Sequence, residues 1–552
     1  MNEKSASKSH SGASAPSIFR SRQAAENSLC ETVVVPSQDR WNDFGYRILA
    51  DIGLRNPSGG LEWLGAHFAI EGEKNLLEAV IQWVPDGDSG LPLSELGKPF
   101  ASLMNDAKHY SLAGRAIGHE EARRRLIALN DAALLDAEGK DVPGWKDFFS
   151  SEVFAMSMIR SSESYFALRH GAAALAGRPI YGVDARQPFS VTLGRPPGAD
   201  LEFNFEFDRD NALRGRIAVI IGPNGSGKTF SLSRLAHWLA DVRSRSSSGS
   251  EPRDVNQVLA FAHTGSLKLF RPSRRDTTYV RVRAFALDPL ASRKQQRRES
   301  DTRLLIDIAR AHDMNGPSLT YLTNILKEEF PTLHIRVPVK RESGVHAPLV
   351  PPGATEYVPL ENLMNGGEQR RLEAAAEIDP TKKLEYLGED QKRWRPSLGQ
   401  LTFLRFVLTA LAHAGPASVF LVDEPENFLH PNLISRFMRV LNRVLENTRS
   451  IAILATHSPF VVREVQNAQV HVITEDDGRP TISKPLMQTL GANVASISNQ
   501  VFGDDLPEHL YEEILSRTET NNRSFEEVLD RYASELSTEA LMLLRKRMET
   551  GS

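Results

Sequence analysis

The run GPNGSGKT at residues 222–229 constrains the fold of this chain more than any other feature. It fits the pattern G-x-x-x-x-G-K-[ST] and directly follows a short apolar run, Ile217–Ile221. After it, Leu232, Leu235 and Leu239 recur at helical spacing. A buried parallel strand, a tight loop and a helix form the setting in which this pattern binds phosphate. The sequence therefore predicts a P-loop within an α/β domain.

The residue types in this run match the chemistry of phosphate binding. Lys228 supplies a point charge for the β- and γ-phosphates, and Thr229 offers a hydroxyl to Mg²⁺. The start of the following helix adds its positive dipole end. A nucleoside triphosphate and Mg²⁺ are thus the predicted ligands of this run. The remaining predicted phosphate-binding residues form the loop that turns backbone N–H groups toward the anion: Gly222, Pro223, Asn224, Gly225, Ser226 and Gly227.

Length and charge exclude several classes of protein. The chain has 552 residues, of which 41% are hydrophobic, enough for two or three domains with their own cores. Its formal charge of −4 gives no global attraction to nucleic acid or to an anionic membrane. The single cysteine, Cys30, excludes an intrachain disulfide framework and a multi-cysteine metal site. We expect a cytoplasmic protein.

No stretch of the sequence has the length of apolar residues that a membrane span or a secretory signal peptide needs. Membrane partners are therefore not expected. Residues 1–37 are rich in Ser and offer little to bury, so we expect a disordered tail there.

Hydrophobic patterning divides the rest of the chain. Residues 38–185 carry their own apolar segments and predict an additional, mainly helical N-terminal domain of unknown role. Within it, the HEEARRRL run is typical of a solvated helix face rather than of a catalytic site. Residues 201–207 alternate in the manner of a strand, and their row of Phe side chains favours a core over adenine stacking.

A local basic cluster follows the P-loop helix. Nine Arg and Lys side chains lie within residues 271–298, which is enough to follow a phosphate backbone, although a solvated or domain-bridging surface explains it equally well. DNA is thus one candidate partner. Residues of about 295–395 have the pattern of a helical insertion in the α/β domain.

Two further apolar strands end in residues suited to phosphate chemistry. In VFLVDEPE, Asp423 is placed to hold the Mg²⁺ shell and Glu424 to orient or deprotonate an attacking water. In IAILATHSP, His457 follows the next strand along the chain and is expected to contact the γ-phosphate or the water. Glu424 and His457 are therefore the predicted catalytic residues, and Thr229 and Asp423 the predicted metal ligands.

A fourth motif, PSLGQ, opens a helix just before the DE strand. Its Ser-x-Gly-Gln turn makes a second helix N-terminus suited to an anion. A competing run, MNGGEQRR, places Gly366 much farther ahead of Asp423 than Ser397 is. One helix and a short loop fit only the shorter spacing, which favours PSLGQ.

In this order, GPNGSGKT, PSLGQ, VFLVDEPENFLHP and ATHSP make residues 186–480 resemble the ATP-binding-cassette (ABC) ATPases. Within that family the chain is similar to the soluble branch of SMC-type heads, OLD-family proteins and the ATPases of bacterial anti-phage systems such as Septu, Gabija and retrons. The resemblance implies an α/β ABC-type P-loop NTPase head with a mixed sheet. It also implies a homodimer in which Ser397 and Gly399 of one subunit complete the ATP site of the other.

The chain departs from the family signature, which reads closer to L-S-G-G-Q. Pro396 and Leu398 replace the first Leu and the first Gly, whereas the Ser, the second Gly and the Gln remain. The family's Gln-loop residue has no clear counterpart, although Gln295 and Gln296 are available. Residues 481–552 predict a C-terminal helical segment without the clustered carboxylates of an OLD-type nuclease.

These observations lead to one principal hypothesis and two alternatives. The principal one is an ATP-hydrolysing, nucleotide-gated dimer that controls a partner effector, such as a nuclease, in anti-phage defence. The first alternative is a DNA repair or chromosome-maintenance ATPase that binds DNA through the basic cluster. The second is a slow-turnover, ATP-bound sensor or scaffold.

Overall fold

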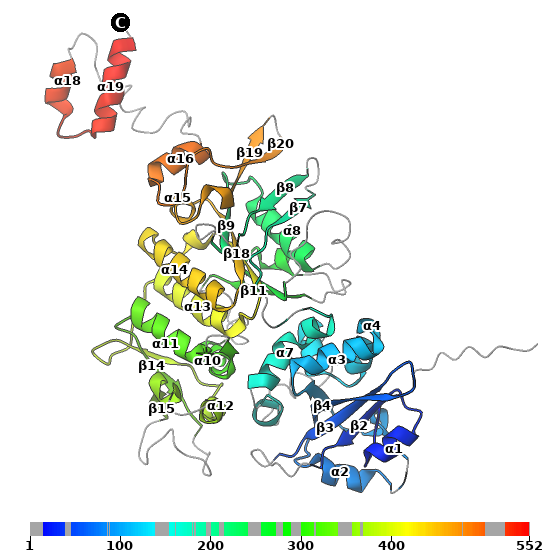
Figure 1. Ribbon diagram of the computed structural model, residues 1–552. Helices are drawn as coiled ribbons and strands as arrows, with labels where there is room; N and C mark the ends of the chain where they lie inside the picture. Colours follow the sequence, from blue (N-terminus) through cyan, green and yellow to red (C-terminus); the bar gives the residue numbers. More distant parts are fainter. Residues whose placement is uncertain are drawn as a thin grey trace, which may run out of the picture. The chain divides into compact units, whose positions relative to one another are not determined.

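The chain forms two compact units, residues 1–492 and 493–552, which are considered separately. The structure is a computed structural model (Figure 1). It describes residues 15–38, 46–85, 87, 89–138, 154–159, 162–178, 180, 184–194, 200–208, 215–240, 255–271, 280–288, 300–313, 316–340, 356–364, 368–476, 479–502 and 525–550.

The first part of the larger unit is built on a mixed six-stranded sheet in the order β5-β1-β2-β3-β4-β6. The central strands pair antiparallel, with Ile52 opposite Leu64 and Ala66 opposite Met104. The strands are β1 (Ser17–Ile18), β2 (Thr32–Pro36), β3 (Leu49–Arg55), β4 (Leu61–Ile70), β5 (Leu91–Pro92) and β6 (Phe100–Met104).

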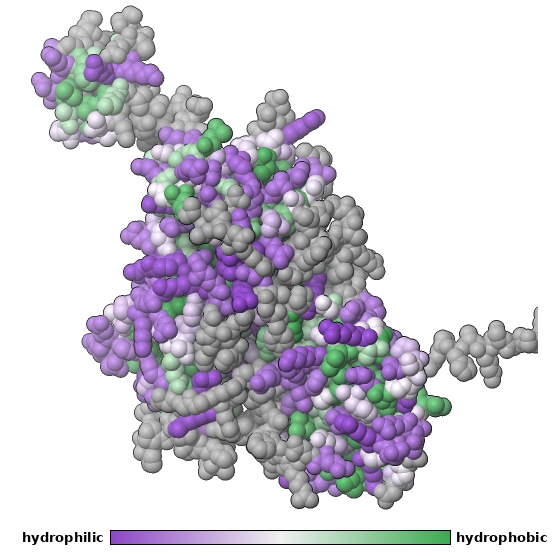
Figure 2. Space-filling view, viewed as in Figure 1, coloured by the Kyte–Doolittle hydropathy of each residue, from purple (hydrophilic) through white to green (hydrophobic). Residues whose placement is uncertain are grey.

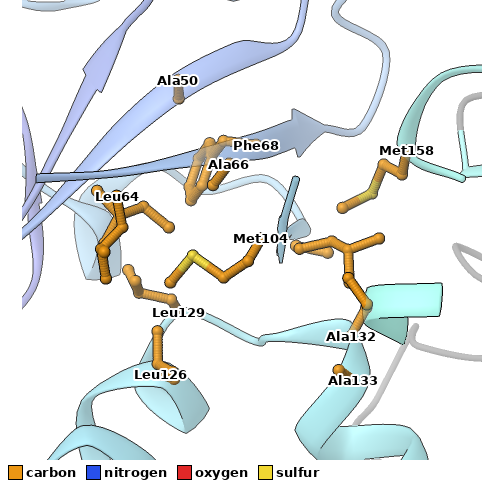
Figure 3. Close-up of a cluster of buried hydrophobic side chains, with 14 of the residues drawn as sticks. Ala50, Leu64, Ala66, Phe68, Met104, Leu126, Leu129, Ala132, Ala133 and Met158 are labelled. Atoms are coloured by element: carbon orange, nitrogen blue, oxygen red, sulfur yellow. The ribbon is translucent and has the colours of Figure 1, made fainter. Parts of the chain in front are cut away.

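Helices accompany this sheet, but the sheet itself is a correction to the predicted mainly helical domain, because its strands are ordered by pairing between segments that lie apart in the sequence. Side chains of β3 and β4 meet helical residues in a buried cluster, in which Leu64 and Phe68 lie near Met104, Leu126 and Leu129 (Figure 3). The helices are α1 (Arg22–Asn27), α2 (Leu76–Trp83), α3 (Ala107–Ile117), α4 (His119–Ala128), α5 (Ala132–Glu138), a π-helical turn (Phe154–Met158) and α7 (Ser162–Leu175).

The prediction of a disordered tail at residues 1–37 is wrong from residue 17 onward. Ser17–Ile18 and Thr32–Pro36 form strands of the sheet, and Phe19 and Val33 are almost completely buried. The run of β-branched residues in β2 completes a sheet whose partners lie farther along the chain, and pairing with β3 orders it. The sequence prediction therefore missed these strands, because their stability comes from pairing with residues far along the chain and not from the apolar content of the segment itself.

The second part of the larger unit contains the P-loop strand in a seven-stranded sheet with the order β11-β10-β17-β18-β9-β19-β20. All adjacent pairs are parallel except β19 with β20. The strands are β9 (Ile217–Ile221), β10 (Gln257–Ala262), β11 (Arg281–Ala286), β17 (Ser418–Asp423), β18 (Ile451–Thr456), β19 (Val470–Asp476) and β20 (Arg479–Ser483). The predicted α/β P-loop fold with a mixed sheet is confirmed.

Strands β9, β17 and β18 are buried along their whole length, as continuous apolar runs in a covered parallel sheet should be. The helices that follow the motifs are α8 (Lys228–Ala240), α13 (Leu398–His413), α14 (Pro431–Asn447) and α15 (Pro459–Val462) (Figure 1). Helix α8 packs against β17 and β18, and α13 packs against α14.

A hairpin of β7 (Phe189–Leu193) and β8 (Leu201–Phe205) precedes the P-loop strand. Phe203, Phe205 and Phe207 are buried, and Phe189 stacks on Trp238 of α8 with ring centroids 6.0 Å apart. The Phe row is therefore core, which was the favoured interpretation.

The insertion contains a small sheet as well as helices. Three antiparallel strands take the order β15-β14-β16. The elements are α10 (Asp301–Arg310), the bridge pair β12 (His312–Asp313) and β13 (Gly316–Pro317), α11 (Ser318–Glu329), β14 (His334–Pro338), β15 (Tyr357–Pro359), α12 (Glu368–Glu377) and β16 (Glu385–Leu387).

Short 3-10 turns complete the larger unit, at Leu93–Glu95, Leu267–Phe270, Leu360–Met364, Pro425–Asn427 and Asn467–Gln469. The smaller unit contains α16 (Val494–Phe502), α18 (Phe525–Tyr532) and α19 (Thr538–Thr550). Helices α18 and α19 share a small core of Val528, Ala540 and Leu544.

Hydrophilic residues cover most of the coloured surface in Figure 2, and hydrophobic residues lie among them singly and in small groups. Among the described residues, no helix combines the length and the apolar character that crossing a membrane requires.

Candidate functional site

The predicted site residues follow strands that end at one edge of the parallel sheet. Thr456 of β18 is level with Ile221 of β9, and Asp423 of β17 is level with Ala455 of β18. The P-loop, the DE pair and His457 therefore leave the sheet side by side. Ligands of open parallel sheets bind beyond the carboxyl ends of the strands, so this edge is the candidate site.

The P-loop has the backbone conformation that its glycines permit. Gly225 and Gly227 have φ values of 84° and 94°, in the left-handed region that side chains disfavour. A Cβ on Gly222 would lie 2.4 Å from the carbonyl oxygen of Ile473 on β19, so only glycine fits between the P-loop strand and its neighbour. The close approach of β19 therefore requires glycine at the first residue of the loop.

Lys228 begins α8 and is almost fully buried beneath the loop. Its Nζ donates hydrogen bonds of 3.0 Å to the carbonyl oxygens of both Gly222 and Pro223. Burial lowers the pKa of Lys228, while the charges of Glu424, Glu426 and Asp423 act in the opposite direction. The ammonium group is therefore fixed in place by the carbonyl oxygens of the loop and lies within the field of three carboxylates.

Thr229 and Asp423 come together across the two elements. The Thr229 hydroxyl donates a 2.8 Å hydrogen bond to Oδ1 of Asp423, whose Oδ2 lies 3.5 Å from the Ser266 hydroxyl. Burial raises the pKa of Asp423 to about 6 against the opposing effect of the Thr229 hydrogen bond. A bound cation would stabilise the ionised form of this buried carboxylate.

This oxygen cluster suits Mg²⁺, which prefers hard oxygen donors and is held by few protein ligands together with substrate phosphates. Thr229 and Asp423 would hold the ion. The backbone N–H groups of the loop, with Lys228 and the start of α8, would hold the phosphates of a nucleotide. The donor set therefore fits both predicted cofactors.

Glu424 follows the strand in a conformation that is rare for a residue with a side chain. Its φ and ψ of 48° and 57° are left-handed, and its N–H donates a 2.8 Å hydrogen bond to the Ala455 carbonyl of β18. The carboxylate accepts a 2.8 Å hydrogen bond from the side-chain amide of Asn427. Such strain clusters at functional sites and here directs the carboxylate away from the strand.

His457 lies between two carboxylates. Its Nδ1 is 3.2 Å from Oε1 of Glu426 and 3.9 Å from Oε1 of Glu424. The side chain of His457 remains 38% exposed, whereas that of Glu426 is 7% exposed. The imidazole is therefore accessible to a ligand while one of its edges faces a buried carboxylate.

Ser397 and Gly399 lie at the start of α13. Ser397 caps the helix by a reciprocal pair of hydrogen bonds with Gln400, of 3.2 Å and 2.9 Å. A Cβ on Gly399 would lie 2.8 Å from the Phe428 carbonyl oxygen, in the loop that follows the DE pair. The helix N-terminus is exposed, with Leu398 next to Ser397 at 48% exposure.

Three polar residues of the site were missed in the sequence. Asn427 and Glu426 belong to the DEPEN run, in which the sequence assigns metal binding or catalysis to Asp423 and Glu424 alone. Ser266 follows β10, the neighbour of the DE strand, and strand order cannot be read from one sequence. A polar segment after each apolar strand was the only available signal for Ser266.

Two predictions lie largely outside the described residues. Gln295 and Gln296 belong to a range that the structure does not describe, as do six of the nine basic residues of the 271–298 cluster. Of the described part, Arg283 faces inward and contacts Asp136 at 3.3 Å. Arg283 is therefore not available to a phosphate backbone, and the cluster loses that member.

Comparison with known proteins agrees with the geometry. Residues 289–463, which include Ser397, Asp423, Glu424 and His457, match the family model described as "AAA domain, putative AbiEii toxin, Type IV TA system". Protein ea59 of Escherichia phage lambda is 28% identical over 368 residues, covering 65% of this chain and 67% of that protein.

Similar solved structures include Stu0660 of Streptococcus thermophilus, at 11% identity and a TM-score of 0.26 over 66% of this chain and 93% of that one. An SMC head bound to the C-winged helix domain of ScpA has 11% identity and a TM-score of 0.28 over 54% of this chain and 97% of that one. CbiO1 of Clostridium perfringens has 13% identity and a TM-score of 0.24 over 61% and 96%.

The P-loop, the strand order and the family match together define an ABC-like P-loop ATPase fold of the α/β class. This fold carries the expectation of nucleotide binding.

Proposed function

We propose that this protein is an ATP-hydrolysing, nucleotide-gated dimer that controls a partner effector in anti-phage defence. The observation that carries the ATPase part is the convergence of Lys228, Thr229, Asp423, Glu424 and His457 at one edge of the sheet. These side chains supply a phosphate-binding charge, oxygen ligands for a cation, a carboxylate for water and a group for the γ-phosphate.

In the proposed reaction, the loop and Lys228 bind and orient the phosphates, while Thr229 and Asp423 would hold Mg²⁺, which would neutralise phosphate charge. Glu424 orients the attacking water and accepts its proton as the water oxygen bonds to the γ-phosphorus. The bond from that phosphorus to the β–γ bridging oxygen breaks, and ADP leaves with this oxygen. Asn427 holds one oxygen of this carboxylate, which leaves Oε1 on the side of His457. His457 then stabilises the charge that develops on the γ-phosphate.

Dimerisation is proposed from the place of Ser397. Its side-chain hydroxyl accepts the capping hydrogen bond of α13 and lies at an exposed helix N-terminus. In the ABC ATPases that the motifs resemble, the equivalent turn acts on the nucleotide of a second subunit. Gly399 packs against the loop after Glu424, so closure around ATP in the partner would bear directly on the proposed catalytic base.

The role in defence is supported by the similarity of DEPENFLHP and ATHSPF to defence ATPases and by the match to a model named for a toxin–antitoxin system. Phage lambda also encodes a similar chain. Such an ATPase would use closure and opening to signal to an effector, such as a nuclease, that carries the destructive chemistry. The inward-facing Arg283 gives the DNA-maintenance alternative no support.

The test is the Glu424→Gln variant, which keeps the size and hydrogen bonding of the side chain but removes its basicity. We expect ATP binding to persist, hydrolysis to fall by about 100-fold or more, and a dimer to accumulate on addition of Mg-ATP, measured by light scattering. Glu446→Gln is the matched control, because Glu446 is exposed near the end of α14, at the opposite edge of the sheet. Hydrolysis at the unmodified rate would remove Glu424 from the proposed role.

Effector control needs a separate test. Expression of the wild-type chain with its neighbouring genes should lower phage plaque counts, and Lys228→Ala should abolish this protection. Equal plaque counts with both would contradict the defence role while leaving the ATPase proposal intact.

A further inference from the structure

Glu426 is a carboxylate that the proposed reaction does not use, although it lies within the site. It occupies the 3-10 turn after β17, and its side chain is nearly buried. Burying a carboxylate costs free energy unless hydrogen bonds or charges compensate. The groups around Glu426 therefore indicate why a carboxylate is buried at this position.

The Glu426 carboxylate accepts hydrogen bonds from the end of β18. Oε1 accepts a 2.6 Å hydrogen bond from the Thr456 hydroxyl and a 2.7 Å hydrogen bond from the His457 backbone N–H. The Thr456 oxygen in turn accepts from the Ser458 N–H at 2.9 Å. Oε1 of Glu426 thus fixes the backbone position of His457.

The same oxygen also faces the imidazole ring, 3.2 Å from Nδ1 of His457. The two atoms do not form a hydrogen bond, but a negative charge this close to Nδ1 favours the form of the ring in which Nδ1 carries the proton. The second carboxylate near Nδ1, that of Glu424 at 3.9 Å, acts in the same sense. With Nδ1 facing the carboxylates, Nε2 is the ring nitrogen left for the nucleotide, and it donates a hydrogen bond to the γ-phosphate when it also carries a proton.

We infer that Glu426 is the positioning residue of His457: it holds the backbone and the Nδ1 edge of the imidazole, so that Nε2 is the nitrogen presented to the nucleotide. The inference rests on the proposed ATPase function for its consequence in catalysis. Its structural content, the placement and tautomer of the ring, stands on the contacts alone. Carboxylates that orient histidines in this way act on reactivity through the ring and not by touching the substrate.

The first test reads the tautomer directly. In the full-length protein with ¹⁵N-labelled histidine, the ring signals of His457 are assigned by their loss in His457→Asn. At a pH where the ring is neutral, we expect Nδ1 to be protonated and Nε2 unprotonated. A wild-type ring protonated at Nε2 would overturn the inference, whether or not the protein hydrolyses ATP.

The second test uses Glu426→Gln, which retains an oxygen to accept from Thr456 and from the His457 N–H but lacks the negative charge. We expect the Nδ1-protonated form to lose its dominance and kcat to fall about 10- to 100-fold, while the Kd for ATP changes less than about twofold. Thr456→Val is the matched control, because it removes one hydrogen bond to Glu426 and leaves its contact with the ring. This control should keep the tautomer and most of kcat.

The outcomes separate this inference from the proposed function. If wild-type protein shows the expected tautomer and Glu426→Gln shifts it, the inference stands even where no ATP hydrolysis is measured, and only the proposed function fails. If Glu426→Gln leaves both the tautomer and kcat unchanged, Glu426 does not position His457. If Thr456→Val shifts the tautomer as strongly as Glu426→Gln, backbone placement alone explains the effect and the role of the carboxylate charge is refuted.

Discussion

The Thr229 hydroxyl and the Asp423 carboxylate, which are far apart in the sequence, lie 2.8 Å from one another as hydrogen-bond donor and acceptor. The contact joins the first turn of α8 to the end of β17. Both oxygens face the edge of the sheet at which the P-loop begins. Their proximity is the geometric basis for assigning a cation to this site.

Replacing Thr229 by Val should weaken nucleotide binding in the presence of Mg²⁺. The weaker nucleotide binding that occurs without Mg²⁺ should stay unchanged. In the proposed site the hydroxyl would contribute an oxygen to the cation; losing a hydrogen bond to a charged group is worth about 1.5–3 kcal/mol, or roughly a 10- to 100-fold rise in Kd. Calorimetric titration with ATP, in Mg²⁺ and in EDTA, measures the difference.

Thr229→Ser is the matched control, since it retains the hydroxyl on a smaller side chain. It should bind within a few-fold of wild type in Mg²⁺. Equal Kd values for the Val and Ser variants in Mg²⁺ would show that the hydroxyl does not serve the cation.

Replacing Gly399 by Ala should destabilise the turn at which α13 begins. The new Cβ would lie 2.8 Å from the Phe428 carbonyl oxygen, and backbone cannot move aside as cheaply as a side chain. A loss of about 1–3 kcal/mol is expected for such overpacking, measured as a lower Tm.

Gly215→Ala controls for the substitution itself, because a Cβ there meets nothing within 4 Å. Its Tm should stay within experimental error of wild type. If the two variants melt alike, Gly399 is not constrained by the loop after Glu424.

Much of the site could be predicted from the sequence because each motif follows a continuous apolar run. Ile217–Ile221, Ser418–Asp423 and Ile451–Thr456 are parallel strands, and their ends bring Lys228, Asp423 and His457 to one edge. The P-loop pattern also fixes a local backbone, since its glycines adopt positive φ. These features depend on short stretches of sequence, so a single chain reveals them.

What the sequence did not reveal depends on distant partners. Thr32–Pro36 becomes a strand because β3 pairs with it, and its apolar residues gain burial only in that sheet. Arg283 belongs to a basic run, yet it faces inward because Asp136 and His413 lie beside it. The proposed role of Glu426 depends on its contacts with Thr456 and His457. These residues lie close to Glu426 because of the strand order, which the local sequence pattern does not reveal.

Asp131 should make the stability of the protein decrease as pH rises from about 4 to 7. It is fully buried, and it accepts hydrogen bonds from the Tyr110 hydroxyl and from the N–H groups of Ala133 and Leu134 at the start of α5. Burial raises its pKa from 3.8 to about 7, against the effect of these hydrogen bonds. Within this window the folded state therefore holds a proton that the unfolded state has released.

The sign follows from linkage. The stabilisation associated with this proton is complete below pH 3.8 and is lost as the pH rises through about 7, with a slope of at most about 1.4 kcal/mol per pH unit. Asp131→Asn removes the titrating group, so the wild-type minus variant difference in unfolding free energy should fall across the window and flatten above it. Denaturant titrations at several pH values measure this difference.

Asp106→Asn is the control, because Asp106 caps α3 from a half-exposed position. The downward slope should survive this substitution. A slope that Asp131→Asn leaves in place would exclude Asp131 as its source.

His413 should stabilise the contact between the N-terminal helices and the ATPase fold as a neutral acceptor. Its Nδ1 lies 3.0 Å from Nη2 of Arg169 on α7 and 2.7 Å from Nη1 of Arg283 on β11. Burial, together with the charges of Arg283 and Arg169, lowers the pKa of His413 well below 6.5, so the ring is neutral at pH 7 and accepts from a guanidinium.

His413→Phe keeps a ring that can stack on Phe285, whose centroid is 4.7 Å away, but removes the acceptor that both guanidinium groups face. Leaving a buried charged donor without this partner costs about 1–3 kcal/mol, so a lower Tm is expected at pH 7. The control is His334→Phe on β14, where the side chain is exposed. Equal melting of the two variants would contradict the role of His413, because their shared change would then be only the loss of an imidazole.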